Sequence, residues 1–239
     1  MSGFVLKGAL VEFMPTFLPV PVPNVIVFQY NPETMTHVWT QPMPATTAGS
    51  EASNPLAVRG TPGESFSFTI AMDARDEIAG GSAPAAALAA ASGIYSRLAA
   101  LEMLLYPTSP AQPGLTGTVT AAISSVLSGA AAGPVRTIPR SVLPVTLFIW
   151  GAGRIVPVRV TDLTITEQLF DALLNPIHAE AQLTLRVLTP AELVAASADD
   201  DVLGTLAAVA YNYTLSLRQA LAVANLANAG ESVIGMIPH

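Results

Sequence analysis

The fold of this chain is decided by a stretch near its N-terminus, which reads Val25-Ile26-Val27-Phe28-Gln29-Tyr30-Asn31-Pro32-Glu33-Thr34-Met35. A largely apolar strand reaches an Asn-Pro turn, and a second extended segment follows through Trp39. Asn tolerates turn geometry, and Pro32 fixes φ and lacks the N–H group that a sheet ladder requires. The first strand therefore has to end there. Taken alone, the pattern also fits an ordinary β-hairpin in an unrelated protein.

The composition is unusually apolar for a soluble chain. Of its 239 residues, 51% are hydrophobic and only 11% are charged, against a usual charged share of roughly 25%. Membrane residence and burial against protein neighbours both explain such a surface. The longest uncharged run, residues 103–135, is broken by prolines and by Ser and Thr, whereas a spanning helix needs about 20 predominantly apolar residues. Burial against neighbouring proteins is therefore the preferred explanation.

Charge and cysteine content exclude several classes of function. The net charge is −7, and no cluster of Lys and Arg is present to neutralise phosphates, which argues against nucleic acid as a partner. Without cysteine the chain forms no disulfide and no thiolate metal site. The first residues, Met1-Ser2-Gly3-Phe4, lack the pattern of a secretory signal. We therefore expect cytoplasmic synthesis without export by the general pathway.

Strand signals dominate both halves of the chain. Apolar and polar residues alternate over residues 66–72 and again over 177–187, which is typical of strands with one dry face. Between residues 155 and 165 the apolar parity shifts by one, which predicts a β-bulge near Thr161-Asp162. Residues 145–150 are apolar on both parities and predict a central strand.

Turns, helices and an insertion separate these strands. Gly151-Ala152-Gly153 predicts a hairpin turn. Helical spacing of apolar residues predicts one helix over about 84–105, with Gly93 as a candidate break. It predicts a second helix over about 202–227, which begins after an acidic cluster at 199–201 that can cap it. The Pro- and Gly-rich residues of about 107–143 are too many for an ordinary loop and predict an insertion.

Two separated motifs resemble one family. The first stretch is similar to the F-Q-F-N-P-E signature of the tube and baseplate-hub proteins of contractile injection systems, which are phage-tail-like machines. The second half matches their closing hairpin: a strand at 158–167, then Phe170-Asp171, then Asn175-Pro176-Ile177 and an alternating strand to Leu188. The resemblance covers roughly residues 3–75 and 143–190. The LysM module that usually follows is not visible after residue 190, which puts in doubt any role that this module performs.

The resemblance implies a fold and a division of the chain. We expect a mainly β (α+β) protein: a twisted antiparallel β-sandwich or split barrel of the phage-tail-tube type, with one packed helix and an added C-terminal helix. The tube-like β domain would cover residues 1–190, with the insertion at about 107–143, and a helical extension would cover 191–239. The residues that match the family motifs are the candidates for assembly contacts: Phe28, Tyr30, Asn31, Pro32, Glu33, Phe170, Asp171 and Pro176.

The resemblance also implies a function. The chain would be a structural component of the baseplate and inner tube, forming a homo-oligomeric ring, six copies in such machines, that joins the tube to the spike hub. Its partners would be the inner tube protein, the spike or hub protein and the baseplate wedge proteins. Assembly would take place within the phage-tail-like particle, with or without later release from the cell. The alternative is an extracellular ligand- or carbohydrate-binding β-sandwich module.

The residues offer little for catalysis. His37, His178 and His239 are the histidines, and they lack the spacing of a metal site. No nucleophile elbow, P-loop or dinucleotide fingerprint occurs, and a membrane-associated hydrolase would need a nucleophile–base pair that is not found. The nearest group of carboxylates, within residues 73–77, is interpreted as a solvated turn or an inter-subunit ion pair. We therefore expect no enzyme activity, no cofactor and no metal.

Overall fold

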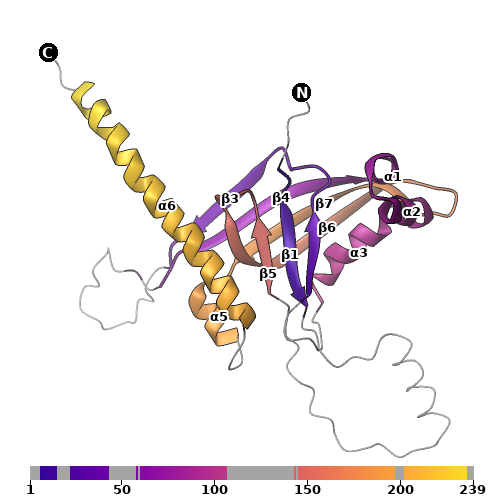
Figure 1. Ribbon diagram of the computed structural model, residues 1–239, viewed down its shortest axis with the longest axis horizontal. Helices are drawn as coiled ribbons and strands as arrows, with labels where there is room; N and C mark the ends of the chain where they lie inside the picture. The colour runs from indigo at the N-terminus through magenta and orange to yellow at the C-terminus, as the bar shows by residue number, and fades with distance from the viewer. Residues whose placement is uncertain are drawn as a thin grey trace, which may run out of the picture.

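The computed structural model describes residues 6–14, 22–42, 58, 60–106, 143, 145–196 and 202–235. These residues form mainly an antiparallel sheet of seven strands, accompanied by helices (Figure 1). The strands are β1 (Ala9–Met14), β2 (Val22–Val27), β3 (Met35–Thr40), β4 (Gly63–Asp73), β5 (Thr146–Ile149), β6 (Ile155–Phe170) and β7 (Pro176–Val187). The expected mainly β (α+β) class is confirmed.

The order of strands in the sheet is β2-β1-β5-β6-β7-β4-β3. β2 and β3, which flank the Asn-Pro turn, therefore do not form a hairpin: β2 pairs with β1, and β3 pairs with β4. The expected alternating strands are β4 and β7, which pair with each other. β5 lies between β1 and β6, as its apolar residues predicted.

Two local predictions about β6 are confirmed. The register of β6 against β7 shifts between Val160 and Asp162, where the parity of the sequence changes, and this irregularity is the expected bulge. A tight turn at residues 151–153 joins β5 to β6, and Gly151 has a positive φ of 67° there. Glycine adopts this conformation without steric cost.

The sheet folds over on itself, and its inner face is the core. The rings of Phe68 on β4 and Phe148 on β5 are stacked with centroids 5.5 Å apart, although β6 and β7 lie between those strands. A flat sheet with strands about 4.8 Å apart would separate them by about 14 Å. The buried residues of β4, β6 and β7 line the same inner face, including Phe66, Ile70, Met72, Val158, Val160, Leu183 and Leu185.

Three helices follow β4, where one helix with a break was expected: α1 (Ala74–Gly80), α2 (Ala83–Ser92) and α3 (Tyr95–Met103). The break at Gly93 is confirmed. Gly93 has a φ of 58°, and an added Cβ would lie 2.1 Å from the carbonyl oxygen of Pro176. The next residue, Ile94, donates its N–H to that same oxygen at 3.0 Å. Only glycine fits this contact.

The C-terminal helices are α5 (Pro190–Ala196) and α6 (Val202–Gly235). α6 starts where the sequence predicted and continues past the expected end at residue 227. It crosses one end of the sheet and projects away from it, whereas α1, α2 and α3 lie at the other end (Figure 1). In the described part of the chain, no helix has the length and apolarity needed to cross a membrane. The expected insertion, apart from residue 143, and the acidic cluster at 199–201 lie outside the described residues.

Candidate functional site

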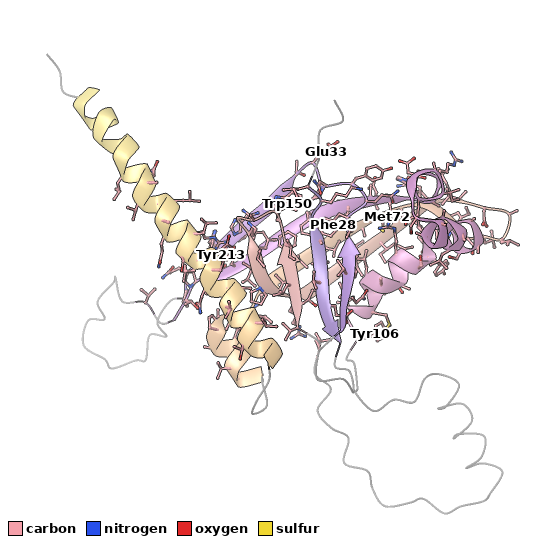
Figure 2. All side chains as sticks on the ribbon, in the orientation of Figure 1. Phe28, Glu33, Met72, Tyr106, Trp150 and Tyr213 are labelled. Carbon is pink, nitrogen blue, oxygen red and sulfur yellow. The ribbon has the colours of Figure 1, made fainter. Side chains whose placement is uncertain are left out.

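The residues Phe28 to Glu33, here called the N-terminal motif, begin with a core aromatic. Phe28 is buried, and its ring lies 5.5 Å from that of Phe68 and 6.5 Å from those of Phe148 and Trp150. Figure 2 shows Phe28 and Trp150 together over the middle of the sheet. Aromatic pairs at these distances add to the stability that burial already provides. Phe28 is therefore a packing residue rather than an exposed contact.

Gln29 joins the N-terminal motif to the far end of β4. Its side-chain amide donates to the carbonyl oxygen of Asp73 at 2.8 Å, and its side-chain oxygen accepts from the Asp73 N–H at 2.9 Å. These two hydrogen bonds satisfy the backbone N–H and carbonyl groups of Asp73 as a neighbouring β-strand would. It connects the end of β2 to β4, although four strands separate β2 from β4 in the sheet. Sequence reasoning quoted Gln29 but assigned it no role, because a polar residue after a strand gives no sign of its partner.

Tyr30 and Asp76 form a hydrogen bond between the N-terminal motif and α1. The Tyr30 hydroxyl donates to the Asp76 carboxylate. This hydrogen bond, with desolvation and the negative charge of Asp76 adding to it, raises the pKa of Tyr30 to about 12. Tyr30 is therefore protonated at physiological pH and serves as a donor.

Asn31 holds the N-terminal segment in place and does more than form a turn. Its side-chain oxygen accepts from the Gly8 N–H at 2.9 Å, and its amide donates to the Leu6 carbonyl oxygen at 2.8 Å. Pro32 follows half-buried, and Glu33 is exposed. Of the expected assembly residues in this motif, Tyr30 and Glu33 are the exposed ones; the contacts of Phe28 and Asn31 lie within the chain itself.

The acidic residues of α1 have separate structural partners. Asp73 caps the helix by accepting from the Arg75 N–H at 2.8 Å, a standard use of Asp at a helix start. Glu77 pairs with the Arg97 guanidinium on α3 through two hydrogen bonds. The sequence predicted a solvated turn or an inter-subunit ion pair here; the structure shows a helix, and its carboxylates contact α3 and the N-terminal motif of the same chain.

The hairpin tip, defined here as residues 169–175, comprises the end of β6 and the loop that joins it to β7, and it is organised by Asp171. The Asp171 carboxylate accepts from the Leu173 N–H at 2.7 Å, the Asn175 N–H at 2.8 Å and the Asn175 side-chain amide at 2.9 Å. The side-chain and backbone hydrogen bonds of Asn175 lower the pKa of Asp171. Pro176, buried at the start of β7, accepts from Ile94. Pro176 thus lies against the α2–α3 junction, and Asp171 organises the loop immediately before it.

The hairpin tip exposes apolar side chains. Leu173 and Leu174 are 80% and 78% exposed, and Leu169 and Phe170 are also exposed. Leu169 and Leu174 have positive φ values of 55° and 65°, which is costly for residues with a Cβ. Of the expected assembly residues in the second motif, Phe170 is the exposed one. A loop that holds leucines outward in strained conformations is a candidate contact surface.

A buried ion pair attaches α6 to the sheet, and sequence reasoning missed it. Glu64, only 4% exposed at the start of β4, accepts from Arg218 of α6 at 2.9 and 2.5 Å and lies 2.8 Å from His37 Nε2. The Arg218 guanidinium also lies over the Trp39 ring, 4.9 Å from its centroid. We call Glu64, Arg218 and His37 the Glu64 cluster. Its members are so far apart in the sequence that no local pattern joins them.

The charge state of His37 is set by its surroundings. Burial lowers its pKa, Glu64 acts in the opposite direction, and the positive charges of Arg154 and Arg218 lower it further. His37 is therefore neutral at pH 7 and donates one hydrogen bond to Glu64, while Arg218 carries the balancing charge.

α6 is anchored to the sheet at a second point, the start of β6, which extends beyond the end of its neighbour β7. The Thr214 hydroxyl donates to the Ile155 carbonyl oxygen at 2.7 Å and accepts from the Ile155 N–H at 3.1 Å. Tyr213 donates to the Ala152 carbonyl oxygen at 3.1 Å; Figure 2 labels Tyr213 on this part of α6. These contacts lie in the first half of the helix.

The second half of α6, residues 219–235 and here called the distal arm, extends beyond these anchors. Every described side chain from 219 to 226 is exposed, including Leu221, Val223 and Leu226 at 62%, 66% and 68%. No residue from 219 to 230 carries a charge. An apolar helix without a polar face is normally buried.

Within the described ranges, no group of three or more His, Asp or Glu side chains could hold a metal ion. In comparisons with known proteins, no family model and no curated protein sequence matches this chain.

Proposed function

We propose that this protein is a structural subunit of a contractile injection system, forming a ring in the baseplate and inner tube that joins the tube to the spike hub. Support comes first from the two motifs and their order in the chain. The N-terminal motif lies where Gln29 joins the end of β2 to β4 and so closes the curled sheet. The Phe170-Asp171…Pro176 motif lies where the longest hairpin, β6–β7, ends.

The observation that carries this proposal is the distribution of exposed apolar side chains. They occur on several elements, and among them are the outer residues Val25 and Val27 of β2, the hairpin tip and the distal arm. A monomer in water gains nothing from such surfaces, and large exposed apolar patches mark contacts with partners. A ring subunit, in contrast, has lateral neighbours on both sides and further neighbours above and below.

The ends of the sheet support the same proposal. β2 and β3 are its terminal strands, and in the described part of the chain each pairs on one side only. Strand edges left unpaired invite association with another chain. In a ring, neighbouring subunits can cover these edges, and the low charge of the chain suits surfaces that become buried.

The partners that follow are copies of this chain, the inner tube protein, the spike or hub protein and the wedge proteins of the baseplate. Sugar-binding modules usually present free aromatic faces. Here one face of the exposed Trp39 ring is covered by Arg218, and Trp150 packs on Phe28 and Phe148. The injection-system function therefore fits these aromatic residues better than a carbohydrate-binding function does.

The test is assembly. The full chain would be purified alone and co-expressed with the tube and spike proteins of a contractile injection system from the same genome, and examined by native mass spectrometry and negative-stain electron microscopy. We expect rings, or a stable complex with tube or spike. A chain that stays monomeric and associates with neither would refute the proposal. A matched comparison with the truncation 1–218 would show whether the distal arm is needed.

A further inference from the structure

Two of the contacts that hold α6 to the sheet differ in their response to pH. The Thr214 hydroxyl is bound by the backbone of Ile155, and neither group titrates near neutral pH. Arg218 lies about one helical turn later and is bound by the Glu64 carboxylate, which also contacts the titratable side chain of His37. Acidification can therefore act on the second contact and leave the first in place.

His37 and Arg218 share one oxygen atom of Glu64. His37 Nε2 lies 2.8 Å from Glu64 Oε1, and a guanidinium nitrogen of Arg218 lies 2.5 Å from the same atom. Neutral His37 supplies one ordinary hydrogen bond, whereas protonated His37 is a full ion-pair partner, and charge-assisted hydrogen bonds are roughly twice as strong as neutral ones. Protonation therefore favours His37 over Arg218 at this oxygen.

The balance of charge around Glu64 adds to this competition. Arg154, which precedes β6, has its guanidinium carbon 5.0 Å from the centroid of the Phe66 ring, on which His37 also stacks. The charged groups that act on His37 are the two arginines and Glu64. Protonation of His37 thus adds a further positive charge where two guanidinium groups already face a single carboxylate. His37 and Arg154 belong to the sheet and its turn, so Arg218 is the cation whose backbone can move away.

The part of α6 beyond Thr214 is long enough to amplify a small rotation. From Thr214 to the end at Gly235, the helix is about 32 Å long at about 1.5 Å per residue. A rotation of about 20° at Thr214 would move its far end by about 11 Å. The described side chains from 219 to 226 are all exposed, so they oppose this movement little.

We propose that His37 is a proton-sensitive switch for α6: when His37 is protonated, it displaces Arg218 from Glu64, and the helix beyond Thr214 swings away from the sheet. This switch lies in the fold of one chain and does not depend on the proposed ring. The released state keeps Glu64 beside His37 but lacks the Arg218 charge, so it binds the proton more tightly than the docked state does.

The direction of the pH dependence follows from this difference. In the docked state, burial and the charges of the two arginines lower the pKa of His37, although Glu64 acts in the opposite direction. The docked state therefore binds fewer protons than the released state, and acid favours release. Docking should be complete well above a pH of about 6.5, the ordinary pKa of histidine, and should weaken as the pH falls below it.

The absence of native cysteine permits a direct test in the full chain. Nitroxide labels are attached to Thr69→Cys on β4 and Leu226→Cys on the distal arm, both exposed positions, and pulsed electron paramagnetic resonance measures their separation at pH 7.5 and 5.0. We expect one separation at pH 7.5 and a second, broader distribution whose population rises about tenfold at pH 5.0, because a difference of one pKa unit between the two states changes their equilibrium about tenfold. The control pair replaces Leu226→Cys by Leu206→Cys, an exposed position before Thr214, and should keep its separation.

Two histidine variants identify the group that binds the proton. His37→Gln can still donate to Glu64 but carries no charge, and it should abolish the second distribution at pH 5.0. His178→Gln, which replaces an imidazole 3.4 Å from Asp73 on β7, should respond like the labelled protein without it. Arg218→Ala should show the released separation already at pH 7.5.

Three results would overturn the inference. The first is an unchanged separation between positions 69 and 226 at the two pH values, which requires no histidine variant. The second is a response that persists in His37→Gln, because another group then binds the proton. The third is an equal movement of positions 206 and 226, because the whole of α6 then leaves the sheet and Thr214 is not the pivot. None of these results bears on the proposed ring, which the assembly experiment tests separately.

Discussion

Replacement of Arg218 by alanine should release α6 from the sheet. The change removes both guanidinium hydrogen bonds to Glu64 and the contact with the Trp39 ring. Glu64 is then a buried carboxylate with His37 as its remaining partner in the cluster. An unpaired buried carboxylate is costly, and two changes reduce that cost: α6 moves away so that water reaches Glu64, or His37 takes up a proton.

The size of the effect follows from these contacts. Breaking a buried pair by removing one partner costs about 3–5 kcal/mol. The Arg218 side chain is partly exposed and His37 remains, so we expect a loss of about 2–3 kcal/mol in the free energy of unfolding. With a slope of about 2 kcal/mol per molar urea, the unfolding midpoint should fall by about 1–1.5 M. Glu64→Gln in the Arg218→Ala background should recover part of this loss, because it removes the unpaired charge.

The pH dependence adds a second readout. Arg218 is one of the charges that lower the pKa of His37, so its removal should raise that pKa. Protonated His37 can then partly replace Arg218, and the defect should be smaller at pH 5.5 than at pH 7.5. Urea unfolding followed by tryptophan fluorescence measures both effects, with Arg159→Ala, an exposed arginine of β6, as the control. If the two alanine variants are equally stable at both pH values, the Glu64 cluster does not anchor α6.

Three other changes test separate parts of the structure. Gly8→Ala puts a Cβ 2.6 Å from the Trp150 ring and, through overpacking, should lower the free energy of unfolding in urea by about 1–3 kcal/mol. Its control is Gly80→Ala, whose Cβ meets nothing within 4 Å and which should leave the stability unchanged. Leu174→Gly should raise the free energy of unfolding by about 0.5–1 kcal/mol in urea unfolding by relieving a φ of 65°; a loss of stability would refute the strain. Burial lowers the pKa of His37, so the unfolded chain binds that proton more readily, and stability should fall as the pH drops below about 6.5; His37→Gln should reduce this slope.

Local patterns predicted the parts of the fold that local physics determines. Alternating polarity located β4 and β7, and the shift in parity located the bulge at Val160/Asp162. The break at Gly93 was predicted because glycine interrupts a helix. In each of these cases a few consecutive residues carry the whole cause. The pairing of β2 with β1 and of β3 with β4 could not be read in this way, because the choice of neighbours depends on the complete sheet.

The contacts that join distant segments were not predictable from the residues. Arg218 lies 154 positions after Glu64, and its sequence context is that of an ordinary charge on a helix. Likewise, Gln29 binds the backbone of Asp73, which any residue could have supplied. α1 was missed for a related reason: its charges were interpreted as a turn, although Asp73 is its N-cap and Glu77 pairs with α3.

The N-terminal motif explains why the sheet has to curl. β2 and β3 are six strand spacings apart in the sheet, about 29 Å if it were flat. The chain from Val27 to Met35, the last residue of β2 and the first of β3, spans about 28 Å when fully extended. This segment is not extended, because Gln29 turns to bind β4 and Asn31 turns to bind the chain before β1. The two terminal strands must therefore approach each other. The sheet curls inward around Phe28 because the segment that contains Phe28 is too short to join the two strands across a flat sheet.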